Sequence, residues 1–178
     1  MAAKKPQGLV ILLTGDGKGK TTSALGQALR AVGHGMRVAV IQFIKDRRGG
    51  EHAAAERLRP DLEIRLMGRG FVPPADQGPI EPHREAARQA LQTVRQTLRD
   101  GRHPMVIADE VLTAVHLGLL SAEEVESLLA DRPHEVHLVL TGRGATENLI
   151  RRADLVTEMK SVKHPHDSGL SAQPGIEF

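Results

Sequence analysis

The segment Thr14–Thr22, with the sequence TGDGKGKTT, combines three glycines with two lysines and three threonines. It follows an apolar run and precedes a stretch with helical spacing, which is the context of a phosphate-binding loop. Glycines let successive backbone N–H groups turn toward phosphates, and a helix N-terminus adds partial positive charge. We expect Lys20 to neutralise phosphate oxygens and the Thr21 hydroxyl to bind Mg²⁺. The segment therefore predicts a site for a nucleoside triphosphate, although Thr14 stands where the common loop has its first glycine.

A second candidate is the run MVIADE, in which an apolar stretch ends in the carboxylates Asp109 and Glu110. In proteins with a phosphate loop, such a strand brings an acid to the metal ion of the bound nucleotide. By itself the run is equally typical of a strand that meets a helix. Together with the loop it predicts a magnesium site, and the spacing leaves open which of the two carboxylates reaches the metal.

A third candidate is Arg143, which lies between glycines in the run Thr141–Gly144 at the end of another apolar stretch. Ligands of open α/β sheets bind outside the carboxyl ends of the strands. An arginine between glycines at that edge can approach a phosphate or a carboxylate closely. The alternative is a plain turn with a solvated arginine.

The elements that must position these residues follow from alternating apolar and helical patterns. Near-continuous Val, Ile and Leu runs are typical of a parallel sheet covered on both faces. The predicted strands are Leu9–Thr14, Arg37–Ile44, Leu62–Met67, Met105–Asp109, Val136–Thr141 and Leu155–Met159. The predicted helices are Lys20–Val32, Glu51–Arg59, Pro82–Arg99, Ser121–Ala130 and Thr146–Arg152. This alternation predicts one α/β domain over residues 1–178, and the Gly- and Pro-rich segment Gly68–Pro82 is expected to be a lid or a connector.

Composition limits the classes of function. The 178 residues include no cysteine, which excludes thiolate metal sites and thiol catalysis, and they carry a formal net charge of only +2. With no Trp, no Tyr and three Phe, aromatic platforms for nucleic-acid bases are nearly absent. The only apolar run near the N-terminus, Gly8–Leu13, is too short for a signal peptide or a membrane span, so we expect a cytoplasmic protein that needs no membrane.

Two further patterns have competing interpretations. Arg84, Arg88, Arg95 and Arg99 share one helical face, but acidic and polar neighbours favour a solvated face over a nucleic-acid interface. His164 and His166 lack the helical spacing of a zinc site, so a metal between them is the weaker interpretation. We expect no nucleic-acid partner.

Taken in order, these motifs resemble the corrinoid adenosyltransferases of the cob(I)yrinic acid a,c-diamide type. The resemblance extends from Gly8 to the last residue. The motifs that carry it are Thr14–Thr22 (TGDGKGKTT), Arg30–Gly35 (RAVGHG), Val40–Lys45 (VIQFIK), Gly70–Phe71, Asp109–Glu110, Arg132–His134 (RPH), Thr141–Gly144 (TGRG), Val162–His164 (VKH) and Ala172–Phe178 (AQPGIEF).

The resemblance implies a RecA-like P-loop fold, a homodimer and a flavoprotein as the electron donor. It implies that ATP gives its 5′-deoxyadenosyl group to the Co(I) ion of a reduced corrinoid, cobalamin or cobyrinic acid a,c-diamide, and leaves triphosphate. Mg²⁺ or Mn²⁺ would accompany the ATP. The family binds ATP in the reversed direction along the loop, which the substitution at Thr14 would fit.

The resemblance also assigns roles to single residues. The triphosphate would be held by Gly15, Asp16, Gly17, Lys18, Gly19, Lys20, Thr21 and Thr22, with Thr14 at the start of the loop. Thr21 and Glu110, with Asp109 beside it, would serve the metal. Arg30, Lys45 and Arg143 would line the nucleotide pocket.

Phe71 would displace the lower axial ligand of cobalt, a step in which the family commonly uses a Trp two positions further along. Here Val72 and Pro73 follow and the chain has no Trp. The chain also ends in Phe178, where the family often has Tyr.

Two other functions use the same motifs. A P-loop kinase or phosphohydrolase would use the loop and the carboxylates to transfer or release the γ-phosphate. A RecA-like nucleic-acid module would need a basic surface, which the small net charge disfavours.

Overall fold

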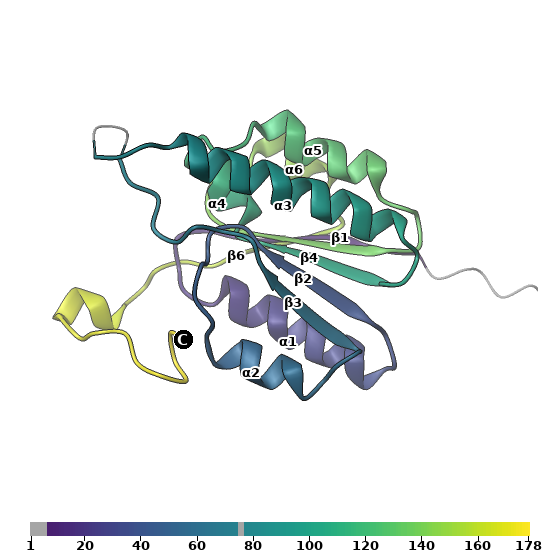
Figure 1. Ribbon diagram of the computed structural model, residues 1–178, viewed down its shortest axis with the longest axis horizontal. Helices are drawn as coiled ribbons and strands as arrows, with labels where there is room; N and C mark the ends of the chain where they lie inside the picture. The colour runs from purple at the N-terminus through teal and green to yellow at the C-terminus, as the bar shows by residue number, and fades with distance from the viewer. Residues whose placement is uncertain (1–6, 75–76) are drawn as a thin grey trace, which may run out of the picture.

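A computed structural model of the chain describes residues 7–74 and 77–178, and these form one parallel sheet between two layers of helices (Figure 1). The strands are β1 (Val10–Thr14), β2 (Val38–Gln42), β3 (Leu62–Leu66), β4 (Met105–Asp109), β5 (His137–Thr141) and β6 (Leu155–Glu158). Their order in the sheet is β3-β2-β4-β5-β1-β6, and every neighbouring pair is parallel. The α/β fold predicted from the sequence is therefore confirmed.

Helices cover both faces of the sheet (Figure 1). On one face lie α1 (Lys20–Gly33) and α2 (Gly50–Glu56). On the other face lie α3 (Glu81–Arg99), α4 (Val111–His116), α5 (Ala122–Asp131) and α6 (Glu147–Arg152). A short 3₁₀ helix, Pro165–Ser168, follows β6. Of the helices in the described ranges, none combines the length and the apolar character that crossing a bilayer requires.

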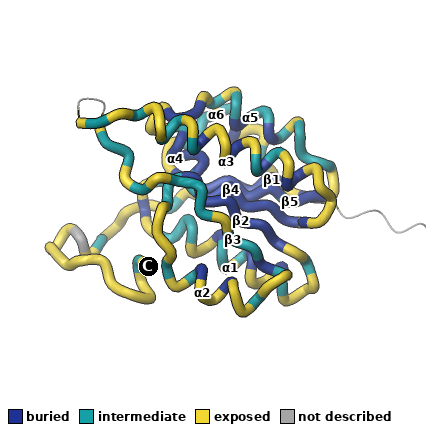
Figure 2. The backbone as a smooth tube through the Cα atoms, in the orientation of Figure 1, coloured by how far each residue is buried: buried dark blue, intermediate teal, exposed yellow. Residues whose placement is uncertain are grey.

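The two-residue period of the strands divides the core into two clusters. In β4, Val106 and Ala108 pack with the helices α3 to α6, whereas Met105 and Ile107 pack with α1 and α2. The central strands are buried on both faces, as their near-continuous apolar runs predict (Figure 2). The edge strand β6 differs, because all four of its residues are exposed.

The same two-residue alternation decides which face of the sheet the polar side chains at the strand ends point to. Gln42 and Asp109 are partners in the register of β2 and β4, and Thr141 follows the β4–β5 pair Ala108 and Leu140. These three side chains lie two residues after Val40, Ile107 and Val139, which pack with α1 and α2, so they point toward the same helices. All three are fully buried. A polar cluster therefore lies under the first turns of those two helices.

The predicted helix boundaries hold within a few residues, with two omissions. Ser121 caps α5 in a capping box: Glu124 N–H donates to Ser121 Oγ, and Ser121 N–H donates to Glu124 Oε2. Neither α4 nor the 3₁₀ helix was predicted, because both are too short to show a helical period. The N-terminal residues 1–6 of the predicted domain, and residues 75–76 of the predicted lid or connector, lie outside the described residues.

The arginines of α3 are engaged by acids and backbone carbonyls. Arg88 contacts Glu81, and Arg99 contacts Asp131 of α5 at 2.5 Å. Arg95 bonds Ser127 at 2.7 Å and also pairs with Asp131. The arginine face therefore joins α3 to α5 and carries local ion pairs.

Candidate nucleotide site

The loop between β1 and α1 has the strained, glycine-dependent backbone that a phosphate loop requires. Gly15 has φ 95° and Gly19, the residue before α1, has φ 117°. A Cβ on Gly15 would clash with the carbonyl oxygen of Met159, so the loop passes close to the chain that follows β6. Two backbone hydrogen bonds fix this approach, from Gly17 N–H to Met159 O at 2.7 Å and from Met159 N–H to Thr14 O at 2.8 Å.

Lys20, the first residue of α1, folds back over the loop. Its Nζ donates to Gly15 O and to Gly17 O, each at 2.7 Å. Burial and the positive charge of Arg143 lower the pKa of Lys20, while Asp16 and Glu110 act against that shift. The ammonium group is therefore short of negative partners, which favours an anion beside it.

Thr21 connects the loop to the buried end of β4. Its hydroxyl donates to Asp109 Oδ1 at 2.8 Å, and the hydroxyl of Thr141 donates to the same oxygen at 2.7 Å. The other oxygen, Asp109 Oδ2, accepts from Gln42 Nε2 at 3.0 Å. The structure thus brings Thr21 and Asp109 together as the two motifs predict.

Glu110 lies beside this cluster in an unusual backbone conformation. It has φ 63°, the only positive φ among the described residues other than glycine, and such strain is concentrated at functional sites. Its N–H donates to Thr141 Oγ1 at 2.8 Å. Burial and the neighbouring Asp109 raise the pKa of the Glu110 carboxyl, although Lys45, Lys20 and Arg143 oppose the shift. A cation at this position would relieve the cost of ionising Glu110.

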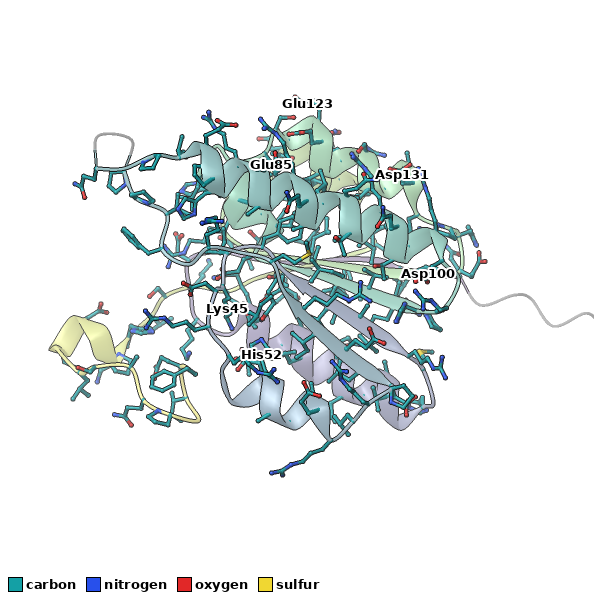
Figure 3. All side chains as sticks on the ribbon, in the orientation of Figure 1. Lys45, His52, Glu85, Asp100, Glu123 and Asp131 are labelled. Atoms are coloured by element: carbon teal, nitrogen blue, oxygen red, sulfur yellow. The ribbon has the colours of Figure 1, made fainter. Side chains whose placement is uncertain are left out.

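A cavity of about 530 Å³ lies over the first turn of α1. Its lining combines charged and polar groups with the apolar side chains of Leu25, Ala54, Ile176 and Phe178. Lys45, which is labelled in Figure 3, lines the cavity. Its Nζ donates to Glu51 Oε1 at 2.8 Å. The lining residues are Lys18, Gly19, Lys20, Thr21, Thr22, Leu25, Lys45, Gly50, Glu51, Ala54, Glu110, Gly175, Ile176, Glu177 and Phe178.

A second cavity, of about 430 Å³, lies on the side of the loop that faces Arg143. It is lined by Asp16, Gly17, Lys18, Lys20, Arg143, Ser161, His164 and Asp167. Lys18 and Lys20 line both cavities, so the phosphate loop separates them. An anion bound to the loop could therefore be contacted by residues of both cavities.

The turn that carries Arg143 is packed tightly against α4. Gly142 has φ 137°, and a Cβ there would clash with the Thr113 backbone nitrogen. The Arg143 N–H donates to Thr113 Oγ1 at 3.2 Å. Arg143 itself is exposed, and its positive charge lowers the pKa of Lys20, so its role in binding an anion stays a prediction.

Two predicted site residues lie elsewhere in this chain. Arg30 is exposed in the last turn of α1, about 15 Å along the helix from Lys20, and does not line either cavity described above. Phe71 follows β3 and is 82% exposed. The roles given to them by family resemblance stay predictions.

Four residues beside the site had no role predicted from the sequence, although Gln42 and Thr141 lie within the quoted motifs: Gln42, His52, Thr141 and Met159. For Gln42 and Thr141 a signal existed, because each is a polar residue at the carboxyl end of an apolar strand. His52 and Met159 gave no such signal, since their positions depend on how α2 and the chain after β6 fold back onto the site.

The parallel sheet, the phosphate loop and the buried acid at the end of the neighbouring strand define a P-loop nucleotide-binding protein of RecA-like fold. Two solved structures support the fold. The KaiC-like protein PH0186 from Pyrococcus horikoshii OT3 superposes with a TM-score of 0.57 over 86% of this chain and 74% of that chain, at 17% identity. The RadB recombinase gives a TM-score of 0.54 over 89% of this chain and 77% of that chain, at 15% identity.

The chain belongs to the ATP:corrinoid adenosyltransferase family BtuR/CobO/CobP, whose family model matches residues 6–178. The corrinoid adenosyltransferase of Escherichia coli K12 is 40% identical over 99% of this chain and 88% of that protein. One from a Sinorhizobium species is 41% identical over 100% of this chain and 84% of that protein. The corrinoid adenosyltransferase CobA of Salmonella typhimurium is 39% identical over 99% of this chain and 88% of that protein. The family predicted from the motifs is confirmed.

Proposed function

We propose that this chain transfers the 5′-deoxyadenosyl group of ATP to the Co(I) ion of a reduced corrinoid, using the loop Thr14–Thr22 to hold the triphosphate as the leaving group. In this reaction the cobalt electron pair attacks C5′. A Co–C bond forms, the C5′–O5′ bond breaks with its electrons on oxygen, and cobalt passes from Co(I) to Co(III). Triphosphate leaves intact.

The observation that carries the proposal is the position of Lys20. Its Nζ lies within 2.7 Å of two loop carbonyls, next to Arg143 and at the wall of both cavities. Because Co(I) is itself a strong nucleophile, no side chain has to be activated as one. The task of this chain is to align C5′ with cobalt and to stabilise the negative charge that develops on the triphosphate.

The residues around Thr21 fit a magnesium ion. Thr21 Oγ1 and the Glu110 carboxylate would supply oxygen ligands, which Mg²⁺ prefers, while both oxygens of Asp109 accept hydrogen bonds from Thr21, Thr141 and Gln42. Within residues 7–74 and 77–178, no cluster of three or more His, Cys, Asp or Glu forms a metal cage, and Mg²⁺ on nucleotides needs only one or two carboxylates with the phosphates. Bound Mg²⁺ would neutralise part of the charge of the triphosphate. Thr21 and Glu110 would hold the ion, with Asp109 positioning Thr21.

Three further elements of the proposal come from family resemblance. We propose a homodimer, a flavoprotein as the source of the electrons that give Co(I), and a cytoplasmic location. Phe71 would act on the lower face of the corrinoid, because its ring is 82% exposed in the segment that follows β3 and is free to contact a bound substrate. Light scattering of the purified chain checks the dimer.

Product identity tests the function. Mg·ATP and a chemically reduced corrinoid are incubated with the protein under anaerobic conditions. The proposal expects intact triphosphate and a light-sensitive cobalt–carbon bond in equal amounts. ADP and phosphate, the products of a kinase or a phosphohydrolase, would contradict it.

A further inference from the structure

His52, in the first turn of α2, has a buried imidazole with a hydrogen bond at each nitrogen. The side chain is 4% exposed. Its Nδ1 accepts from the Gly49 backbone N–H at 2.8 Å, and its Nε2 lies 2.8 Å from Gln42 Oε1. Because Gly49 N–H is a donor, Nδ1 carries no hydrogen, so the neutral ring has its hydrogen on Nε2 and donates to Gln42. Figure 3 shows His52 below the sheet, on the side of α2.

This donor fixes the orientation of the Gln42 amide. With Oε1 engaged by His52, the NH₂ group faces Asp109 and donates to Oδ2 at 3.0 Å. A flipped amide would place its oxygen against the carboxylate oxygen, and two acceptors would then meet in a fully buried place. His52 thus selects the one amide orientation that Asp109 tolerates.

Asp109 in turn positions the phosphate loop. The bond from Gln42 holds Oδ2 toward β2, so Oδ1 faces the hydroxyls of Thr21 and Thr141 at 2.8 and 2.7 Å. Thr141 also accepts from Glu110 N–H at 2.8 Å, where the backbone is strained. One chain of hydrogen bonds therefore extends from α2 through β2 and β4 to the first turn of α1.

We infer that His52 and Gln42 are positioning residues that orient Asp109, and through it Thr21 and Glu110, for the metal–triphosphate complex. The inference rests on the magnesium site proposed above. Neither residue lines the cavity over α1, so both act through Asp109 rather than on the nucleotide. Outer hydrogen-bond partners of metal ligands typically change metal affinity or activity by about 10- to 100-fold.

Two substitutions of His52 distinguish the role of its Nδ1, which accepts from Gly49, from the role of its Nε2, which contacts Gln42. In His52→Asn the amide reaches the position of Nδ1, so it still accepts from Gly49 N–H but no longer reaches Gln42. In His52→Gln the amide reaches the position of Nε2 and keeps the donor to Gln42. A role in capping α2 favours the Asn variant, whereas a role in orienting Gln42 favours the Gln variant.

The test measures Mg·ATP binding by calorimetry without corrinoid, so it does not depend on turnover. We expect His52→Asn to weaken Mg·ATP binding by about 10-fold or more. His52→Gln should stay close to wild type, and ATP with EDTA should bind all three proteins equally. Wild-type affinity in His52→Asn, or an equal loss in the presence of EDTA, would overturn the inference.

A double-mutant cycle with Gln42→Leu shows whether His52 acts through Gln42. We expect His52→Asn to cause no further loss of Mg·ATP affinity in a protein that already carries Gln42→Leu. The same loss with and without Gln42→Leu would contradict an action of His52 through Gln42. If the affinity of the wild-type protein for ATP were the same with and without Mg²⁺, the proposed magnesium site itself would be contradicted. If the Asn variant fails to fold, ¹⁵N NMR of wild-type His52 provides a second test, because hydrogen on Nδ1 in place of Nε2 would overturn the inference.

Discussion

The hydroxyl of Thr21 lies 2.8 Å from Asp109 Oδ1, although the two residues are 88 positions apart in the sequence. The bond joins the first turn of α1 to the end of β4, so it connects the phosphate loop to the buried acid. Thr21 is thereby held where its oxygen can also face a metal ion beside Glu110. The pair is the structural basis of the first prediction.

Replacing Thr21 by Val keeps the shape of the side chain and removes the hydroxyl. We expect Mg·ATP affinity to fall about tenfold or more, which corresponds to about 1.4 kcal/mol. Thr21→Ser retains the oxygen and should stay near wild type. Calorimetry with and without Mg²⁺ provides the measurement. Equal affinities for the Ser and Val variants would show that the hydroxyl is not a ligand.

Lys20→Ala removes the charge that we propose for stabilising the leaving triphosphate. We expect kcat/KM for adenosylation to fall by more than tenfold, or about 1.4 kcal/mol of transition-state stabilisation. Lys18→Ala is the matched control, because Lys18 is more exposed than Lys20 and forms only a long ion pair with Glu177, at 3.9 Å. It should cause the smaller loss. A larger loss at Lys18 would reverse the roles given to the two lysines.

Much of the site was predictable because its residues lie in local motifs. The loop at Thr14–Thr22 and the acids after β4 each follow an apolar strand, and parallel strands bring their carboxyl ends to one edge. Sequence spacing therefore placed Lys20, Thr21 and Asp109 together. Arg143 was predicted for the same reason, since it follows β5.

The rest depends on contacts that no local pattern encodes. His52 reaches Gln42 of β2 only because α2 packs against the neighbouring strand β3. Met159 supports the loop only because the chain after β6 turns back across it. The exposed strand β6 also departs from the expectation of a sheet covered on both faces, because it forms the sheet edge. Such relationships require the tertiary fold.

The ion pair between Glu51 and Lys45 predicts a pH dependence of stability. Burial alone would raise the pKa of Glu51, but the hydrogen bond from Lys45 and other favourable contacts hold it below its ordinary value of 4.5. The stabilisation from ionised Glu51 is therefore present above pH 4.5 and is lost as pH falls through the lowered pKa. Urea unfolding of wild type and Glu51→Gln should show a difference in unfolding free energy that shrinks below pH 4.5. A difference that grows on acidification would contradict the pairing.

Gly142 permits the close packing of the Arg143 turn against α4. Gly142→Ala would place a Cβ against the Thr113 backbone at φ 137°, so we expect a loss of stability of about 1–3 kcal/mol together with lower activity. Gly118→Ala is the control, because Gly118 has φ 67° but open space around it. Its cost should be smaller and activity should be kept. Thermal unfolding and kcat/KM of both variants provide the measurement. Equal losses of stability and activity in the two variants would show that close packing at Gly142 does not matter.

Phe71 offers a test of how the corrinoid is handled without a tryptophan. Its ring is 82% exposed, so Phe71→Ala should leave the melting temperature unchanged and any loss of activity reports on substrate. If Phe71 displaces the lower axial ligand, the loss in kcat/KM should be larger for a cobalamin, which carries that ligand, than for a corrinoid that lacks it. Phe71→Leu should recover part of the loss, because an apolar group is again present to exclude the ligand and water. Equal losses with both corrinoids would remove Phe71 from ligand displacement and leave it a general contact for the corrin ring.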